Sequence, residues 1–174
     1  MDLWALDEVH FQQHGPRCRM GIAPEQPDPI VLHHPTRQSV GYFGAVRLRD
    51  GRFVWQPDTS KFDGTSCWRF LKRLRQASCH SGRRVIALLD NASYHHARLH
   101  HDWRHQASPS FTLEFLPSYS PELNPCERVW KLTRRQATHN QYFPTLEAIT
   151  ERVEHQFNQW RTGNETLRRL CAIT

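Results

Sequence analysis

The sequence lacks the features that mark membrane-spanning, secreted and repetitive proteins. No run approaches the ~18 apolar residues of a membrane span, and no basic start leads into an apolar signal segment. The five cysteines form an odd set without a Cys-x-x-Cys pair, which is typical of reduced thiols inside a cell rather than of a disulfide framework. Internal repeats and low-complexity tracts are absent as well. These absences lead us to expect a soluble protein of the cytoplasm.

The composition is that of one packed domain with a basic balance of charge. The 174 residues include 38% hydrophobic residues, six Trp and nine Phe, which suits a single domain spanning 1–174. Lys and Arg outnumber Asp and Glu by 23 to 17, so the net charge is +6 and the isoelectric point is near 9.4. This balance is compatible with a nucleic acid as partner, but many basic proteins bind no polyanion, so charge alone leaves the partner open.

The first half of the chain has the pattern of antiparallel strands. An apolar run leads from Leu3 to Asp7, and the proline-rich connection at 24–35 cannot be helical. Asp50-Gly51 is typical of a hairpin turn. We expect strands at 3–7, 39–48 and 52–56, and a further strand at 17–22 is compatible with the pattern.

The second half alternates helices with short apolar strands. One helical stripe begins after Asp63, and another, from Leu146 to Trp160, has Thr145 as its cap and Gly163 as its stop. We expect helices at 63–82, 95–105, 125–138 and 146–160, and strands at 85–89 and 111–115. Strands that are joined through helices should be parallel, so this order predicts an α/β fold with a mixed sheet and flanking helices.

Two acidic residues stand at the ends of apolar runs. Asp7 follows the run Leu3–Leu6, and Asp90 follows the run Val85–Leu89. The last residue of a buried strand emerges at the edge of a sheet, where ligands bind. For one such Asp a cap or a turn is the commoner role, but two of them together with Glu127 favour a site where carboxylates converge.

Glu127 lies in a stretch that turns twice and then enters a helix. Ser120-Pro121 and Asn124-Pro125 each put a capping side chain before a proline, which predicts a helix from Pro125 with Glu127 in its first turn. Asn124 and Glu127 also have the spacing of a capping box, in which the carboxylate bonds back to the cap residue. The pattern alone therefore leaves a structural role for Glu127 open.

Three blocks around these acids carry a resemblance to a known family. The blocks are Leu6–Phe11 (LDEVHF), Leu89–His95 (LDNASYH) and Leu116–Trp130 (LPSYSPELNPCERVW). In sequence and in order they resemble the catalytic blocks of the DDE transposases of the Tc/mariner superfamily, in particular the bacterial insertion-sequence branch. Between Asp90 and Glu127 lie 36 residues, close to the interval usual in that family. The chain departs from the family pattern at positions that bear on local packing, namely Met20-Gly21, Ser118 and Cys126.

The resemblance implies a fold, a reaction and partners. It implies an RNase H-like catalytic core in which Asp7, Asp90 and Glu127 form the metal-binding triad, with two Mg²⁺ (or Mn²⁺) ions per active site. The implied reaction is DNA strand cleavage and strand transfer at transposon ends, carried out by a homodimer or a higher assembly on bacterial DNA. Full-length relatives carry an N-terminal helix-turn-helix region. Since the first expected strand begins almost at Met1, we expect that region to be absent here. Either the chain is one of two fragments, with a separate helix-turn-helix protein as a possible partner, or the region has been removed.

A triad of carboxylates has a chemical reason in this reaction. Two divalent cations about 3.5–4 Å apart activate the attacking oxygen of a phosphodiester cleavage and stabilise the departing one. Mg²⁺ prefers oxygen ligands, so a few carboxylates and the substrate phosphate suffice to hold it. Without metal, converging carboxylates repel one another, and we expect the pKa of at least one of them to be raised.

Residues next to the triad have roles that the sequence leaves open. Glu8 points away from Asp7 in a strand, which favours a structural or salt-bridging role. Asn91 is expected to cap or turn the chain after its strand, although it could also position a water or a phosphate. His95 matches a His that the family often has five residues after the second Asp. It could bind a phosphate, orient a carboxylate, or make a local hydrogen bond.

Basic residues follow Glu127 on its expected helix. Lys131, Arg134 and Arg135 form either a solvated face or a surface that holds DNA phosphates without reading bases. The His-rich segment contains pairs with helical spacing for zinc, but no third and fourth ligands follow at a suitable spacing; the pairs are His96 with His100 and His101 with His105.

Two further functions compete with that of an active transposase domain. One is a catalytically silent transposase fragment that binds DNA or a partner without chemistry, which an intact triad disfavours. The other is a different RNase H-like nuclease that acts on a branched or hybrid duplex. Cleavage of plasmid DNA separates the active from the silent protein, and cleavage of RNA in a hybrid indicates the other nuclease.

Overall fold

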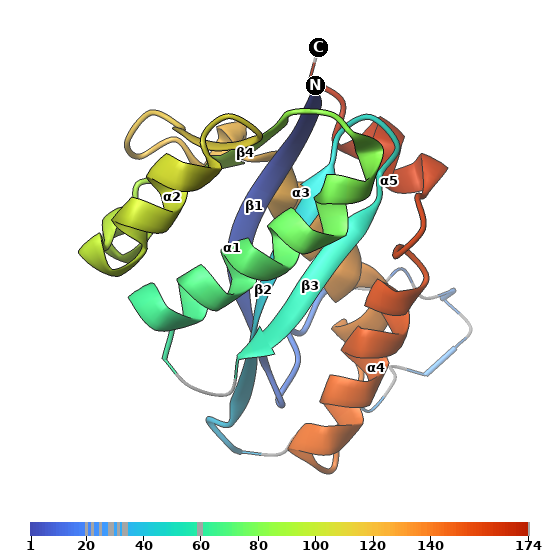
Figure 1. Ribbon diagram of the computed structural model, residues 1–174. Coiled ribbons are helices and arrows are strands. Elements are labelled where there is room, and N and C mark those ends of the chain that lie inside the picture. The colour runs from blue at the N-terminus through green and yellow to red at the C-terminus, as the bar shows by residue number, and fades with distance from the viewer. Residues whose placement is uncertain are drawn as a thin grey trace.

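Within the described residues of the computed structural model, five strands form one mixed sheet (Figure 1). The structure describes residues 1–19, 21, 23–24, 26–27, 30, 32, 35–58 and 61–173. The strands are β1 (Asp2–Gln12), β2 (Ser39–Arg47), β3 (Phe53–Asp58), β4 (Val85–Leu89) and β5 (Phe111–Phe115), in the spatial order β3-β2-β1-β4-β5. β2 pairs antiparallel with both β1 and β3, whereas β4 pairs parallel with both β1 and β5. The predicted α/β fold with a mixed sheet is confirmed.

Helices cover both faces of this sheet. In Figure 1, α1 crosses in front of the sheet and α3 lies behind it. α1 begins after Asp63, the expected cap, whose side chain accepts hydrogen bonds from the N–H groups of Thr65 and Ser66. The α-helices are α1 (Gly64–Ser78), α2 (His101–Ala107), α3 (Pro125–Thr133), α4 (Leu146–Asn158) and α5 (Glu165–Leu170). Shorter turns of 3₁₀-helix are η1 (Cys79–Ser81), η2 (Ser93–His96), η3 (Arg98–His100) and η4 (Pro121–Leu123), and η5 (Arg134–Thr138) is a π-helical turn.

The alternation of side chains along β1 divides the interior into two cores. Leu6 belongs to the core between the sheet and α1, while Ala5 and Val9 belong to the core between the sheet and helices α3 and α4. Successive residues of a strand point to opposite faces. Asp7 therefore lies on the α3 face of the sheet, and Glu8 lies on the α1 face.

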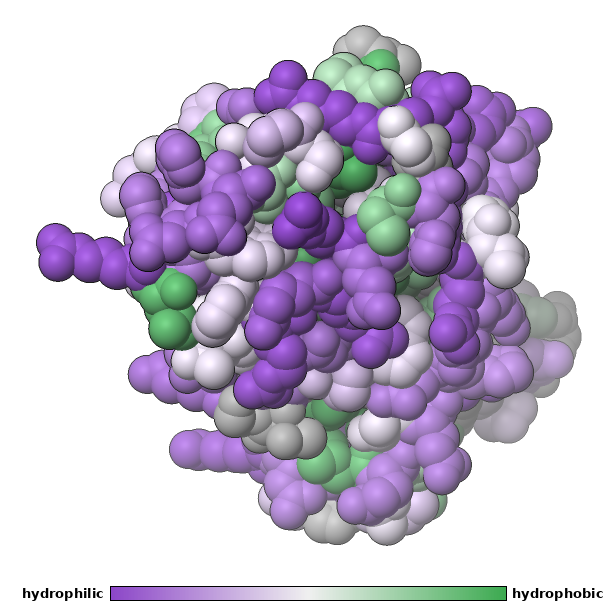
Figure 2. Space-filling view, in the orientation of Figure 1, coloured by the Kyte–Doolittle hydropathy of each residue, from purple (hydrophilic) through white to green (hydrophobic). Residues whose placement is uncertain are grey.

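The apolar stripe expected on the last long helix is part of the second core. Ile149, Val153 and Phe157 of α4 are fully buried. The outer surface on the α1 side is mostly hydrophilic (Figure 2), with the basic side chains Arg69 and Lys72 exposed on α1. Among the described residues, no helix combines the length and apolarity needed to cross a membrane.

β1 is longer than the sequence suggests, so the expectation that Asp7 ends a strand is wrong. The parallel ladder with β4 stops where Ala5 faces Leu88, but the antiparallel ladder with β2 continues to Gln12. Continuing the parallel register by two residues aligns Asp7 with Asp90. The two positions are therefore neighbours in register at the carboxyl end of β4.

Two other expected elements differ from the structure. No strand forms at residues 17–19 and 21, while Met20, Ile22 and parts of the proline-rich connection lie outside the described residues. The backbone of Cys18 bonds instead to the side chain of Asn140, with distances of 2.8 and 3.0 Å. The single helix expected at 95–105 is divided into η2, η3 and α2, because the ring of His100 lies 3.0 Å from the carbonyl oxygen of Tyr94 and fixes a turn between them.

Candidate active site

Asp7 presents a buried carboxylate on the α3 face of β1. Its side chain Oδ2 accepts a hydrogen bond of 2.9 Å from Nε1 of Trp130, and the residue is only 9% exposed. Burial, followed by the charges of Glu8 and Glu127, raises the pKa of Asp7 to about 8. The expectation that at least one carboxyl would have a raised pKa is confirmed, although loss of water contributes more than repulsion between acids.

Glu127 stands in the first turn of α3, as expected. Asn124 caps this helix, because its Oδ1 accepts a 3.1 Å hydrogen bond from the N–H of Cys126. The capping box that the spacing allows is not formed by the described contacts, so the carboxylate of Glu127 is not used to cap the helix. Nδ2 of Asn124 donates a 2.9 Å hydrogen bond to the carbonyl oxygen of Leu6. Asn124 thereby ties the start of α3 to the residue before Asp7, a role that sequence reasoning missed.

Asp90 follows β4 and borders a cavity of about 420 Å³ with the loop 116–121. Its Oδ1 accepts a 3.0 Å hydrogen bond from the N–H of Ala92 and lies 3.2 Å from Nε2 of His95. The His95 ring, and secondarily the Ala92 N–H, hold the pKa of Asp90 below its usual value against the effect of partial burial. Nδ2 of Asn91 donates to the carbonyl oxygen of Leu116, which is the structural role expected after this strand.

Glu8 and His95 turn toward Asp90 from the α1 side. His95 is 1% exposed, and Glu8 is held by a hydrogen bond from the hydroxyl group of Tyr94. In the part of the chain that the structure describes, one group of possible metal ligands has all its donor atoms within 4.8 Å of one another, and it consists of Glu8, Asp90 and His95. Asp7, Asp90 and Glu127 do not form so tight a set. Glu8 is therefore a candidate metal ligand, although the sequence favoured a structural role for it. The feature that could have indicated this role is the position of Glu8 beside Asp7 in a buried strand.

The donor set fits a divalent cation. Asp7, Asp90 and Glu127 offer oxygen ligands, which hard cations prefer. Glu8 Oε2 and His95 Nε2 are buried atoms without a hydrogen-bond partner among the described residues. Because buried polar atoms are normally paired, such atoms mark a place where a ligand could complete the structure.

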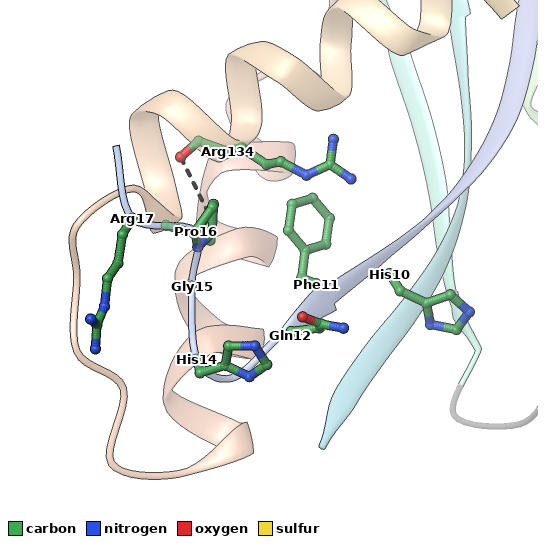
Figure 3. A pocket seen from close by; sticks show the side chains of 9 residues that line it. His10, Phe11, Gln12, His14, Gly15, Pro16, Arg17 and Arg134 are labelled. Atoms are coloured by element: carbon green, nitrogen blue, oxygen red, sulfur yellow. Dashed lines mark hydrogen bonds between the residues drawn. The ribbon is translucent and has the colours of Figure 1, made fainter. Parts of the chain in front are cut away.

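A second cavity of about 460 Å³ lies where β1 ends against η5, and its rim is basic. Figure 3 shows His10, His14, Arg17 and Arg134 around it. The guanidinium carbon of Arg134 is 5.7 Å from the centre of the Phe11 ring. Arg134, which the sequence predicts to bind DNA, is therefore half-buried against this ring.

The remaining residues named from the sequence lie on the surface or within the core. Lys131 and Arg135 are exposed on α3 and η5. The ring of His96 stacks on Phe115 with a centroid distance of 4.2 Å. Neither His pair gathers further ligands among the described residues, so the zinc arrangement is not formed there.

Solved structures of Mos1 transposase have the same fold as this chain. The chain matches the Mos1 strand transfer complex with a TM-score of 0.68 at 19% identity, covering 97% of this chain and 50% of that one. It matches the Mos1 mariner paired-end complex with Mn at 0.66 and 18%, covering 97% and 51%. For the paired-end complex with Mg the values are 0.61 and 19%, covering 98% and 53%. The class of protein is therefore defined by the fold, which is the RNase H-like architecture of transposase catalytic domains.

Two bacterial proteins are similar to this chain in sequence. An uncharacterized 39 kDa protein of the insertion element IS630 from Shigella sonnei is 28% identical over 85 residues, covering 49% of this chain and 24% of the relative. The uncharacterized protein y4pE/y4sA from Sinorhizobium fredii is 33% identical over 83 residues, covering 48% of this chain and 56% of the relative. The matches thus span about a quarter and just over half of the lengths of these relatives.

The family follows from the match to a family model. The model of the DDE superfamily endonucleases matches residues 2–150, so the chain belongs to that family. The resemblance to the DDE transposases of the Tc/mariner superfamily, which the three sequence blocks carry, is confirmed.

Proposed function

We propose that this chain is the catalytic domain of a transposase that cleaves DNA strands at transposon ends and joins them to a target, with Asp7, Asp90 and Glu127 as its catalytic, metal-binding acids. The observation that carries the proposal is the carboxyl group of Asp7. It is buried, its pKa is raised to about 8, and the charge of Glu127, distant in sequence, contributes to that rise. Burying such an acid costs stability that the hydrogen bond from Trp130 offsets only in part, and perturbed acids of this kind mark functional sites.

Each of the three acids has a distinct place in this chemistry. A pair of bound divalent ions, Mg²⁺ or Mn²⁺, would activate the attacking oxygen and stabilise the leaving oxygen. Asp7 on β1, Asp90 after β4 and Glu127 on α3 would be the carboxylates that hold these ions. At neutral pH without cations the Asp7 carboxyl holds its proton, and it gives the proton up when it becomes a ligand. The solved Mos1 complexes with Mn and with Mg support this choice of ions.

The DNA is proposed to lie across the basic side of α3 and η5. Lys131 and Arg135 are exposed, and Arg134 faces the basic cavity of Figure 3. Such side chains hold phosphates without reading bases. The cavity beside Asp90 is placed to receive a strand end. The paired-end complexes of Mos1 support an assembly that acts on two transposon ends, for which we propose a homodimer or a higher assembly.

The proposal is tested by nicking of supercoiled plasmid in Mg²⁺ and in Mn²⁺. We expect the wild-type chain to nick the plasmid in the presence of either metal and to lose this activity in EDTA. Asp90→Asn should lower the rate by at least about a hundredfold, because a lost metal ligand removes stabilisation that is largest in the transition state. Asp102→Asn is the matched control, since the side chain of Asp102 is 96% exposed and contacts only its neighbour His101 among the described residues.

The possible outcomes separate the competing functions. Equal nicking by the wild type and by Asp90→Asn would show that the acids are not the source of the activity. No nicking by any of the proteins, on plasmid or on transposon-end duplexes, would indicate a catalytically silent domain. Preferential cleavage of the RNA strand of a hybrid would indicate a different RNase H-like nuclease.

A further inference from the structure

Three side chains that could bind a metal ion lie close together on the α1 side of the sheet, where β1, the end of β4 and η2 meet. Glu8 Oε2, Asp90 Oδ1 and His95 Nε2 all lie within 4.8 Å of one another. Nε2 of His95 is 3.2 Å from Asp90 Oδ1 and 3.9 Å from Glu8 Oε2. Donor atoms bound to one cation at about 2.1 Å are about 3 to 4 Å apart, so the distances of 3.2 and 3.9 Å are compatible with three ligands of one cation.

The other polar atom of each outer side chain is already held. The hydroxyl group of Tyr94 donates to Glu8 Oε1, which leaves Oε2 directed at the cluster. Cys67 Sγ lies 3.3 Å from Nδ1 of His95, which leaves Nε2 directed at the same point. Asp90 is fixed by the N–H of Ala92. Partners that orient a ligand through its second polar atom are characteristic of built metal sites.

Two of the three donor atoms lack a hydrogen-bond partner although they are buried. Within the described residues, Glu8 Oε2 and His95 Nε2 make no hydrogen bond, and His95 is 1% exposed. Nε2 nevertheless lies within ion-pair distance of both acids, at 3.2 Å from Asp90 Oδ1 and 3.9 Å from Glu8 Oε2. Leaving such atoms without a hydrogen-bond partner costs free energy. A cation at the centre of the cluster would satisfy both at once.

We propose that Glu8, Asp90 and His95 bind a divalent first-row transition-metal ion, such as Mn²⁺, on the α1 side of the sheet. The inference rests on the proposed function in one respect, since Asp90 is assigned to both sets of ligands. The imidazole nitrogen distinguishes this set from the all-oxygen triad. Imidazole suits transition-metal ions such as Fe²⁺ and Zn²⁺, and the two carboxylates of this set suit Mn²⁺ as well, whereas Mg²⁺ prefers oxygen ligands and keeps its waters. With the nitrogen of His95 as a ligand, this site should therefore favour a transition-metal ion over Mg²⁺.

The test measures metal binding directly. Binding of Mn²⁺ to the purified chain is followed by the loss of the free-ion signal in electron paramagnetic resonance, with Mg²⁺ as a competitor. We expect Glu8→Gln and His95→Gln to weaken one class of Mn²⁺ site by about tenfold or more, since even partners of ligands affect affinity by that factor. Glu114→Gln and His101→Gln carry the same changes at exposed positions and should bind Mn²⁺ as the wild type does. Excess Mg²⁺ should not displace the ion from this site.

A second measurement keeps the proposal decisive if either variant folds poorly. Pulsed paramagnetic resonance of the Mn²⁺-loaded wild-type chain should show coupling to an imidazole nitrogen, and its absence would overturn the proposal. Unchanged Mn²⁺ affinity in both folded variants would also overturn it, and would leave a protonated His95 paired with the two acids as the alternative. Failure of the proposed function looks different. Asp7→Asn and Glu127→Gln would then nick plasmid as the wild type does, while the nitrogen-coupled Mn²⁺ site would remain.

Discussion

The folded protein favours the neutral form of the Asp7 carboxyl group, whereas the proposed chemistry needs its ionised form. Its raised pKa comes first from burial, then from the charges of Glu8 and Glu127, and is partly offset by the hydrogen bond from Trp130. In the metal-free protein the folded state therefore prefers a neutral acid, while a metal ligand must be ionised. Cation binding and ionisation of Asp7 are coupled in consequence.

Asp7→Asn should stabilise the metal-free protein above neutral pH. A pKa of about 8 in the folded state against 3.8 in the unfolded state means that the folded state binds more protons between these values. Wild-type stability therefore falls as the pH rises through this window, and below about pH 4 the carboxyl is neutral in both states. We expect the Tm of Asp7→Asn in EDTA to exceed that of the wild type by about 5 °C or more at pH 8.5, and to match it near pH 4. Scanning calorimetry at a series of pH values measures this.

Asp102→Asn is again the control, since its exposed carboxyl should leave the Tm difference independent of pH. A constant difference between Asp7→Asn and the wild type across the whole pH range would contradict the coupling. The same would follow if Asp7→Asn melted below the wild type at pH 8.5.

At the scale of elements, α3 is docked on β1 through its own cap. Asn124 is 2% exposed and serves two purposes, because Oδ1 caps the helix at Cys126 and Nδ2 bonds to the carbonyl oxygen of Leu6. Asp7 and Glu127 each lie within a few residues of these contacts. The position of Glu127 relative to Asp7 therefore depends on Asn124 as well as on the bond from Trp130 to Asp7.

Asn124→Ala should destabilise the protein and impair nicking more than its stability loss explains. Loss of a cap costs about 1 kcal/mol, and an unpaired buried carbonyl adds about 1 kcal/mol or more, so we expect a loss of about 2–3 kcal/mol. Asn164 caps α5 through a 3.1 Å bond from the N–H of Leu167, which makes Asn164→Ala a control with a similar loss of a cap away from the acids. Urea unfolding and nicking rates measured below the unfolding transition separate the two effects. Full activity of folded Asn124→Ala would refute the docking role.

At the scale of the whole molecule, α3 can approach the sheet because β2 carries a glycine opposite Asp7. Gly44 pairs with Asp7 across the antiparallel ladder. A Cβ atom at Gly44 would come within 2.6 Å of Cζ of Phe53 and would meet the indole ring of Trp130 more closely still. Trp130 donates a hydrogen bond to Asp7, so the distance between α3 and the sheet also fixes the position of the Asp7 carboxyl group.

Gly44→Ala should push Trp130 away from Asp7 and loosen the whole α3 layer. Overpacking of this kind typically costs about 1–3 kcal/mol. We expect a lower urea midpoint and a changed fluorescence of Trp130. The Trp130 signal is obtained by subtracting the fluorescence of a Trp130→Phe variant, with and without Gly44→Ala. Gly21→Ala is the control, because no described atom lies within 4 Å of its added carbon. An unchanged midpoint for Gly44→Ala would show that the layers can adapt without cost.

Much of the architecture was predictable because its signals are local. Turn and cap chemistry marked Asp63 and Thr145 as helix starts, and both cap their helices. The apolar run Val85–Leu89 is a strand with the expected ends. The short helix α5 was not anticipated, since six residues carry little periodicity and its stability depends on burial of Leu167.

The sequence by itself determined the mixed sheet and most of the order of the elements, and it predicted the three acids, because periodicity, turn residues and motif blocks act over a few neighbouring positions. Only the tertiary structure decided how those acids are presented. Pairing with β2 put Asp7 inside a strand and buried it, and packing against α1 turned Glu8 and His95 toward Asp90. The physical reason is that burial, pKa and ligand geometry depend on atoms contributed by segments far apart along the chain, which no local pattern records.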